Sequence, residues 1–228
     1  MADELVVNEI YSSIQGESTW AGLPCTFIRL SFCDLRCHYC DTEYAFYEGK
    51  KMGLDEILRQ TQKYSHSLIE VTGGEPLLQP KTPQLLHLLC ERGYMVLLET
   101  SGAHDISKID PRVHRIMDLK CPSSGEMKRN RLENLSHLTQ NDEIKFVIGS
   151  REDYEWARTM VLTHSLATQV KTVLFSTAFH TVSQLGHIQG HTGLESKSVV
   201  KWILEDNLPV RFQLQIHKFI WPPMQRAV

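Results

Sequence analysis

The sequence predicts an α/β fold in the form of a partial (open) parallel β/α barrel of six to seven strands. Two observations predict it. Apolar, β-favouring segments alternate with segments of helical spacing, and polar or glycine residues follow most of the apolar segments. The alternation implies parallel strands joined by crossover helices. Polar residues at the C-terminal ends of parallel strands build active sites, especially in barrels, so their positions favour a partial barrel over an open sheet.

The predicted strands and helices follow one another along the whole chain. The strand pattern occurs in segments 26–30, 68–72, 94–99, 113–119, 143–148, 170–175 and 212–216. Apolar residues recur at helical spacing in segments 54–58, 85–89, 154–162 and 198–204. Gly93 follows the second of these helical segments, where a glycine suits the helix C-cap.

Length and composition indicate one globular domain over residues 1–228. The 24 basic and 27 acidic residues leave a net charge of −3, which argues against a protein that grips nucleic acid through its phosphates. No apolar run approaches the roughly 20 residues of a membrane span. Residues 1–4 are acidic where a signal peptide would be basic and then apolar. We therefore expect a cytoplasmic protein with no nucleic-acid and no membrane partner.

A cluster of cysteines is the most informative local feature. Cys33, Cys37 and Cys40 have the spacing C-x3-C-x2-C, and without an export signal such thiols indicate a metal or redox centre in place of disulfides. Three thiolates on one loop can bind three irons of a [4Fe–4S] cluster and leave the fourth iron without a protein ligand. The alternative is a structural zinc site completed by Cys25 or His38, although no second Cys/His pair stands out.

A second motif places the cysteines in a family. Gly73-Gly74-Glu75-Pro76 follows the second predicted strand, and on its own it would be compatible with a simple turn. The two motifs together, in this order, resemble the radical S-adenosylmethionine (SAM) superfamily. The resemblance implies that SAM binds the open iron and that an electron from the cluster cleaves SAM to a 5′-deoxyadenosyl radical. The cofactor then supplies the chemistry, and no further catalytic side chain is expected.

The remaining sequence narrows the resemblance to the 7-carboxy-7-deazaguanine synthase family. The segments that carry it are 7–18, 21–30, Cys40-Asp41-Thr42, Tyr44 and 216–221. The chain departs from the family pattern at Ser18 and Phe32, where glycine is expected, and in segment 177–179, which lacks the usual proline. None of these departures removes a predicted ligand.

The resemblance implies a carbon–nitrogen lyase of queuosine and 7-deazapurine biosynthesis. Such an enzyme contracts 6-carboxy-5,6,7,8-tetrahydropterin to 7-carboxy-7-deazaguanine with release of ammonia, and SAM is regenerated in each turnover. It further implies Mg²⁺, an electron donor of the flavodoxin or ferredoxin type, a homodimer, and short N-terminal and C-terminal extensions that bind substrate. We expect the C-terminal segment 217–228 to close over the substrate, because its apolar residues and prolines suit a packed ending.

The same resemblance, with the chemistry of the side chains, assigns candidate site residues. The cluster ligands are Cys33, Cys37 and Cys40, and Thr42 is expected to bind Mg²⁺. Predicted SAM contacts are His38, Tyr39, Gly74, Glu75, Asp118, Lys120 and Ser176. Predicted substrate contacts are Ile14, Gln15, Gly16, Arg29, Thr72 and Val228.

For two of these residues a purely structural role is an alternative, and for the chain as a whole two other functions are alternatives. Arg29 can hold a carboxylate bidentately but could be a surface ion-pair partner, and Thr42 could cap a turn or helix. A radical SAM activating enzyme for a glycyl-radical partner would share the cysteine and Gly-Gly-Glu-Pro motifs. A non-enzymatic zinc or iron–sulfur interaction protein is the rival from another class.

Overall fold

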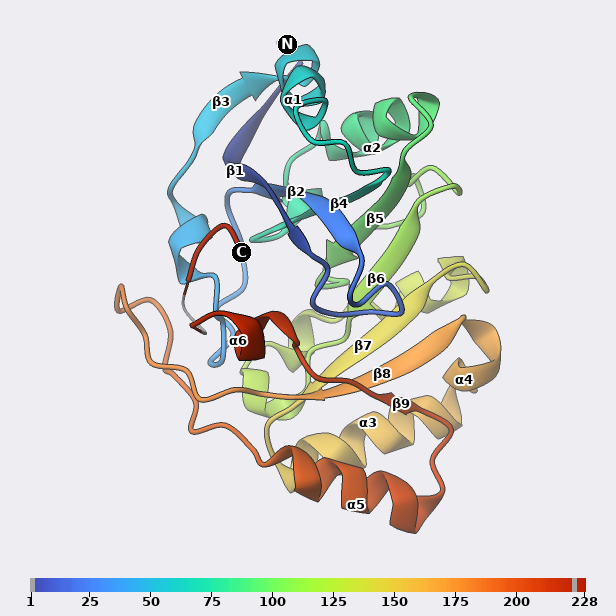
Figure 1. Cartoon of the computed structure of the whole chain (residues 1–228). Helices are drawn as coiled ribbons and strands as arrows, with labels where there is room; N and C mark the ends of the chain where they lie inside the picture. Colours follow the sequence, from blue (N-terminus) through green and yellow to red (C-terminus); the bar gives the residue numbers. More distant parts are fainter. Residues whose placement is uncertain (1–2, 223–224) are drawn as a thin grey trace.

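The computed structural model describes residues 3–222 and 225–228, and its centre is a nine-stranded sheet with the order β3-β1-β2-β4-β5-β6-β7-β8-β9 (Figure 1). The strands are β1 (Glu4–Ile14), β2 (Pro24–Leu30), β3 (Lys50–Gly53), β4 (Leu68–Gly73), β5 (Met95–Thr100), β6 (His114–Asp118), β7 (Glu143–Ile148), β8 (Thr172–Thr177) and β9 (Arg211–Phe212). The helices are α1 (Leu54–Thr61), α2 (Thr82–Glu91), α3 (Arg151–Thr163), α4 (Leu166–Gln169), α5 (Ser196–Asp206) and α6 (His217–Ile220). Short 3₁₀ turns are η1 (Glu43–Phe46), η2 (Pro76–Leu78), η3 (Pro122–Ser124), η4 (Met127–Arg129) and η5 (Leu132–His137).

The predicted fold class is confirmed. Strands β2 and β4 to β9 pair in parallel with their neighbours. Within the described residues the order runs from β3 at one edge to β9 at the other, so the barrel is open. The sequence patterns did not predict β1 and β3, which add an antiparallel ribbon beside β2.

Strand β1 contributes to both faces of the sheet through a β-bulge. Its register against β2 shifts between Val7 and Glu9, which inserts one extra residue. Val7 therefore packs in the helix-covered core, whereas Tyr11 stacks on Phe27 on the inner face. Without the bulge, Val7 and Tyr11 would lie on the same face, because side chains alternate along a strand.

The predicted helices are present as α1, α2, α3 and α5, and of these α3 alone begins with a side-chain cap. Leu54, Ile57 and Leu58 form the buried face of α1, and Ser150 caps α3 by accepting a hydrogen bond from the Asp153 amide. The predicted strand at 212–216 was largely wrong, because only Arg211–Phe212 pairs with β8. The chain beyond it turns away, and the Ile216 amide donates to the Gly16 carbonyl.

Two apolar layers hold the sheet. The larger layer lies between the sheet and helices α1, α2, α3 and α5, and the smaller one lies on the inner face. Further along several strands, the inner-face residue changes from apolar to charged. The pairs are Phe27 and Arg29, Leu68 and Glu70, Leu97 and Glu99, and Ile116 and Asp118. The apolar layer thus closes one end of the barrel and leaves a polar cavity toward the C-terminal ends of the strands.

Two further observations bear on the sequence predictions. All six cysteines are free thiols in the structure. None of the helices in the described part of the chain combines the length and the apolar character needed to cross a bilayer.

A buried ion pair gives a test of stability remote from the cavity. The Arg115 Nε and Nη2 atoms donate to the Asp142 carboxylate at 2.8 and 2.5 Å, and both side chains are buried. Arg115→Ala should lower the free energy of unfolding by about 3–5 kcal/mol in urea denaturation, because it leaves an uncompensated buried carboxylate. Arg112→Ala is the control, since Arg112 makes its ion pairs at the exposed surface. Equal losses in both variants would contradict the prediction.

Candidate active site

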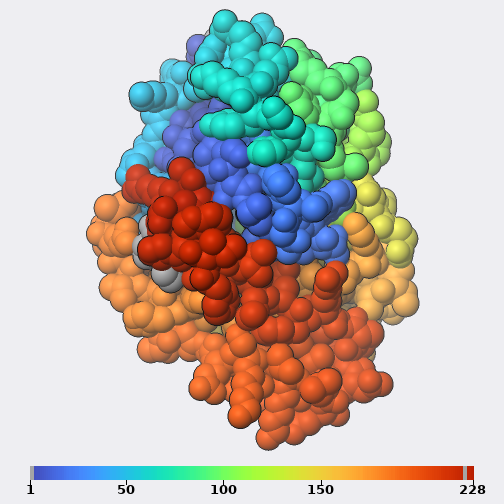
Figure 2. Space-filling view, in the orientation of Figure 1, coloured from blue at the N-terminus to red at the C-terminus, as the bar shows by residue number. Residues whose placement is uncertain are grey.

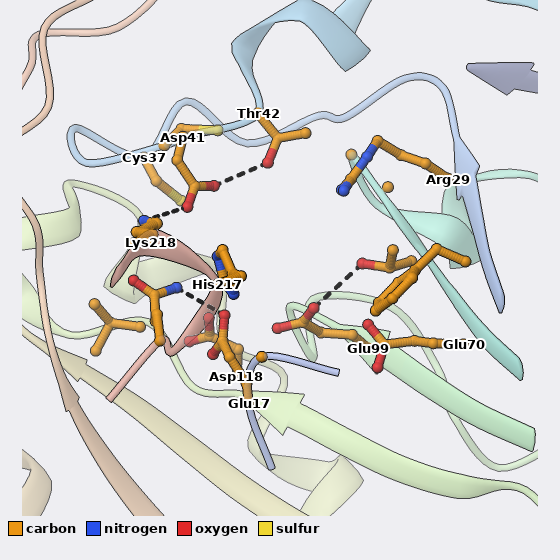
Figure 3. Close-up of a pocket in the computed structure, with 18 of the residues that line it drawn as sticks. Glu17, Arg29, Cys37, Asp41, Thr42, Glu70, Glu99, Asp118, His217 and Lys218 are labelled. Carbon is orange, nitrogen blue, oxygen red and sulfur yellow. Dashed lines mark hydrogen bonds and ion pairs between the residues drawn. The ribbon is translucent and has the colours of Figure 1, made fainter. Parts of the chain in front are cut away.

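A cavity lies at the C-terminal ends of the parallel strands (Figure 3). Its walls come from β1, β2, β4, β5, β6 and β7, from the loop that follows β2, and from the C-terminal segment. Every predicted site residue except His38, Glu75 and Ser176 lines it. Residues that are far apart in sequence therefore converge on one space, which is the arrangement expected of an active site in a parallel α/β fold.

The three motif cysteines open into this cavity. Cys33, Cys37 and Cys40 all line it, and burial raises the pKa of each thiol, that of Cys33 to about 11. No group of three His, Cys, Asp or Glu side chains among the described residues is gathered closely enough for a single metal ion. Three thiols on one loop suit a [4Fe–4S] cluster, in which each thiolate binds a different iron.

Two glycines let the end of β4 approach the cysteine loop. Gly73 has φ +149°, and a Cβ atom there would overlap the Leu30 backbone. A Cβ atom on Gly74 would overlap the Phe32 carbonyl and crowd the Cys33 side chain. The Glu75 amide donates to that same Phe32 carbonyl at 2.8 Å. Only glycine fits at these two positions, so the motif fixes where the first cysteine stands.

Glu75, a predicted SAM contact, is held within the protein and behind the cavity wall. Its side chain is completely buried, and the carboxylate accepts from the Thr100 hydroxyl, from the Ser101 amide and hydroxyl, and from the Leu77 amide. It does not line the cavity. Glu75 therefore ties the end of β4 to the end of β5 through its hydrogen bonds to Thr100 and Ser101.

Two other predicted SAM contacts also lie outside the cavity wall. The His38 amide donates to the Ser124 carbonyl, and its ring lies against Gly125. The Ser176 Oγ is buried on β8 and has no hydrogen-bond partner among the described residues. Tyr39 does line the cavity, and its hydroxyl lies 3.4 Å from the Val147 carbonyl.

The cavity floor is a network of buried charges centred on Lys145. Its Nζ is 3.0 Å from a Glu17 oxygen and 3.7 Å from an Asp118 oxygen, and it also donates to Glu99. Burial lowers the pKa of Lys145, but the surrounding carboxylates outweigh this effect and raise it well above its usual value. Lys120 pairs with Asp118 at 2.9 Å. The floor therefore carries fixed charges of both signs at neutral pH.

Lys145, Glu70 and Glu99 were missed in the sequence analysis. Burial, together with Glu99 and Glu17, raises the pKa of Glu70 well above its usual value, whereas Lys145 lowers that of Glu99 against the effect of burial. The available signal was a charged residue between apolar neighbours of a strand segment, as at Lys145 between Ile144 and Phe146. A charge that faces the interior of a parallel sheet needs partners, and such positions are functional candidates.

The predicted substrate contacts at β1 and β2 already have protein partners. Arg29 pairs with Glu9 at 2.8 Å and donates to the Tyr11 hydroxyl. Its side chain is mostly buried at the cavity wall, so the surface ion-pair alternative does not describe it. The Gln15 side chain contacts Glu70 and accepts from the Glu17 amide. These contacts hold the Arg29 and Gln15 side chains in fixed orientations at the cavity wall.

Thr42 and Asp41 connect the cysteine loop to the C-terminal segment. The Thr42 hydroxyl donates to Asp41 Oδ1 at 2.9 Å, and Lys218 Nζ lies 2.5 Å from Asp41 Oδ2 (Figure 3). Burial opposes ionisation of Asp41, yet Lys218 holds its pKa well below the usual range. Thr42 stands at the N-cap position of η1, but its side chain makes no capping bond. Thr42 therefore does not cap η1 through its side chain, and its hydroxyl oxygen faces the cavity.

The C-terminal segment covers the cavity. Its described residues His217, Lys218, Pro222, Gln225, Ala227 and Val228 all contribute to the lining. Figure 2 shows this segment in red, lying across the face of the molecule between the blue N-terminal part and the orange part near residue 185. Arg226 anchors it by two hydrogen bonds to the Glu48 carboxylate. Pro223, which supported the expectation of a packed ending, lies outside the described residues.

Comparison with known proteins places the site in a family. Residues 27–122 match the family model described as the radical SAM superfamily. A 7-carboxy-7-deazaguanine synthase from Koribacter versatilis is 46% identical over 224 residues, covering 97% of this chain and 99% of the relative. The chain belongs to the 7-carboxy-7-deazaguanine synthase family. The family member from Chlorobaculum tepidum is 43% identical, with 98% of this chain and 97% of the relative covered.

Solved structures show the same fold at lower identity. The crystal structure of QueE from Escherichia coli has a TM-score of 0.62 and 20% identity, and the match covers 92% of this chain and 93% of that one. SuiB from Streptococcus suis, solved bound to S-adenosylmethionine, has a TM-score of 0.57 and 15% identity, over 80% of this chain and 48% of SuiB. The predicted membership of the family is thus confirmed, and its radical SAM character implies a [4Fe–4S] cluster and SAM.

Both positions where the chain lacks the expected glycine have left-handed backbone. Ser18 has φ 65° and Phe32 has φ 74°. Ser18 is buried, its amide donates to Gln213, and its hydroxyl accepts from the Trp20 amide. The departures from the family pattern therefore occur where glycine would be the unstrained residue.

Iron content after reconstitution tests whether the cysteine loop needs the close backbone contact between Gly74 and Phe32. Gly74→Ala should leave far less iron per chain after anaerobic reconstitution, with the circular dichroism of the fold retained, because the new methyl group pushes Phe32 and Cys33 away. Gly53→Ala is the control, since φ there is −67° and a Cβ atom would meet only the Asp3 carbonyl, at 4.0 Å. Full iron content in Gly74→Ala would show that the loop does not need this contact.

Proposed function

We propose that this protein contracts 6-carboxy-5,6,7,8-tetrahydropterin to 7-carboxy-7-deazaguanine and releases ammonia, the carbon–nitrogen lyase step of queuosine biosynthesis. The observation that carries the proposal is the cavity itself, in which three thiols, a set of buried charges and a covering C-terminal segment meet in a member of this family. Because the C-terminal segment covers the cavity, the cavity suits a small-molecule substrate. A glycyl-radical activating enzyme would instead have to bind a segment of its partner protein there.

The cysteine loop holds the redox cofactor in this proposal. Cys33, Cys37 and Cys40 would bind three irons of the [4Fe–4S] cluster, and the fourth iron stays open for SAM. When bound, the cluster and SAM supply the radical that starts the reaction. Tyr39, Gly74, Asp118 and Lys120 line the adjoining wall, where the Asp118–Lys120 pair offers both charges to a zwitterionic ligand. The buried Ser176 hydroxyl, which lacks a partner among the described residues, also stays a candidate SAM contact.

The opposite wall would hold the pterin. Arg29 offers a guanidinium for the substrate carboxylate, and the anionic Glu99 is an acceptor for the N–H groups of the pterin edge. Ile14, Gln15, Gly16 and Thr72 line the same wall. Val228 brings the C-terminal segment to the cavity, so that segment excludes water from the bound substrate.

Thr42 fits a Mg²⁺ site shared with the substrate. Because its hydroxyl proton points at Asp41, the lone pairs of its oxygen are free to coordinate a cation. Mg²⁺ prefers hard oxygen ligands and often takes only one or two from the protein, so the substrate carboxylate and water would complete its shell. A low-potential flavodoxin or ferredoxin would supply the electron, and resemblance to the family also supports a homodimer, which sedimentation of the purified protein tests.

Product formation tests the proposed function. The protein is reconstituted anaerobically with iron and sulfide, supplied with SAM, the pterin and dithionite, and assayed for 7-carboxy-7-deazaguanine by mass spectrometry. Cys33→Ala should abolish product and SAM cleavage, whereas Cys25→Ala should retain the cluster, because Cys25 is buried outside the cavity wall. SAM cleavage without product would refute the proposed substrate, and loss of the cluster in Cys25→Ala would refute the ligand set.

The Mg²⁺ assignment gives a separate prediction. Mg²⁺ should stimulate turnover of the wild type, and Thr42→Ala should lose most of that stimulation while binding SAM as before. Thr42→Ser, which keeps the hydroxyl, should retain it. Turnover is measured against Mg²⁺ concentration, with SAM affinity measured in parallel. The same Mg²⁺ dependence in Thr42→Ala and the wild type would remove Thr42 from the site.

A further inference from the structure

Glu70 places a carboxyl group at the deep end of the cavity (Figure 3). It is 3% exposed, and its register partners are Phe27 on β2 and Leu97 on β5, both members of the apolar layer on the inner face. Thr72, the next inner-face residue of β4, is the register partner of Arg29. Glu70 thus lies one step deeper in the sheet than Arg29, between apolar side chains that favour its neutral form.

Within the described part of the chain, no Lys, Arg or His lies within ion-pair distance of Glu70. The ammonium group of Lys145 is already shared by Glu17, Glu99 and Asp118. Burial, together with the charges of Glu99 and Glu17, raises the pKa of Glu70 well above its usual value. Because an uncompensated carboxylate is costly to bury, Glu70 holds a proton at neutral pH.

Gln15 determines which oxygen of Glu70 carries that proton. Gln15 Oε1 accepts from the Glu17 amide at 3.0 Å, so the amino group of the Gln15 side chain is the part that meets Glu70. Gln15 Nε2 donates to Glu70 Oε2, which makes this oxygen an acceptor. Glu70 Oε1 has no hydrogen-bond partner among the described residues, and Glu70 lines the cavity. The proton therefore sits on Oε1, where a molecule bound in the cavity can receive it.

The titratable and charged groups that face Glu70 come from four parts of the sheet. They are Tyr11 and Glu17 from β1 and the turn after it, Cys25 and Arg29 from β2, Glu99 from β5 and Lys145 from β7. Burial raises the pKa of Tyr11 to about 12 and also raises that of Cys25, so both are neutral at pH 7. The other four are held in ion pairs. Of this set, Glu70 is thus the acid with a proton to give at neutral pH.

We propose that Glu70 is the proton donor to the nitrogen that leaves the substrate as ammonia. The inference rests on the proposed function and adds a general acid to it. As the carbon–nitrogen bond breaks, its electron pair stays on the nitrogen, which takes the proton of Glu70 and leaves as ammonia. The Glu70 carboxylate then takes up the proton that the contracted ring releases as it becomes aromatic. Each turnover thus returns Glu70 to its protonated form, and no oxidant or reductant is consumed in this step.

The test replaces the acid by an amide of the same size. Glu70→Gln keeps an oxygen that can accept from Gln15 but has no acidic proton, so turnover to deazaguanine and ammonia should fall about 100-fold. Pterin and SAM affinities, measured by calorimetric titration of the reconstituted protein, should match the wild type. As the pH rises through the pKa of Glu70, the wild-type rate should fall because the acid ionises, whereas the Glu70→Gln rate should not show this fall. Glu70→Asp should recover part of the rate together with the alkaline fall. Glu133→Gln is the matched control, because the Glu133 side chain is 76% exposed on η5.

Infrared difference spectra test the protonation of Glu70 without cofactors or turnover. At neutral pH, the wild type minus Glu70→Gln should show the carbonyl band of a protonated carboxyl group, and a carboxylate band in its place would overturn the proposal. An unchanged turnover in Glu70→Gln would also overturn it. A weakened pterin affinity with unchanged maximal turnover would make Glu70 a binding residue and overturn it as well. If the wild type itself forms no deazaguanine, the proposed function fails, and with it the reaction that Glu70 would serve.

Discussion

The buried ammonium of Lys145 is the interaction on which the cavity depends. Glu17, Glu99 and Asp118 come from a turn and two strands, and their carboxylates would repel one another if Lys145 were absent. In a region of low dielectric, such a set persists only when opposite charge and hydrogen bonds compensate it. Lys145 supplies both from the strand next to β6. The cavity can therefore be polar and pre-organised even though it lies inside a curved sheet.

The cysteine loop depends on a second constraint, which is purely steric. Gly73 and Gly74 allow the end of β4 to contact the backbone of Leu30 and Phe32, and Glu75 then ties the same strand end to β5. The Gly-Gly-Glu motif thus holds the end of β4 against both the cysteine loop and the end of β5. It fixes the start of the loop that carries the three motif cysteines, which explains why the carboxylate of Glu75 is buried away from the cavity.

The C-terminal segment joins these two parts. Lys218 reaches Asp41 in the cysteine loop, and Gln215 donates to Glu17, which in turn pairs with Lys145. A segment that follows the last strand therefore contacts both the ligand loop and the charged floor. The segment completes the cavity, because its side chains belong both to the wall and to the ion-pair network.

Local sequence patterns were sufficient to predict the fold class, most of the parallel strands and the family to which the cysteine motif belongs. These features follow from local periodicity and from motifs, in which neighbouring residues carry the information. Tertiary structure alone decided the partners of Lys145, the burial of Glu75 and the bulge that turns Tyr11 toward the cavity. The physical reason is that a buried charge or an inward-facing side chain is defined by residues distant in sequence. The sequence pattern shows that a charged residue occupies an unusual position, but only the folded sheet shows which groups pair with that charge.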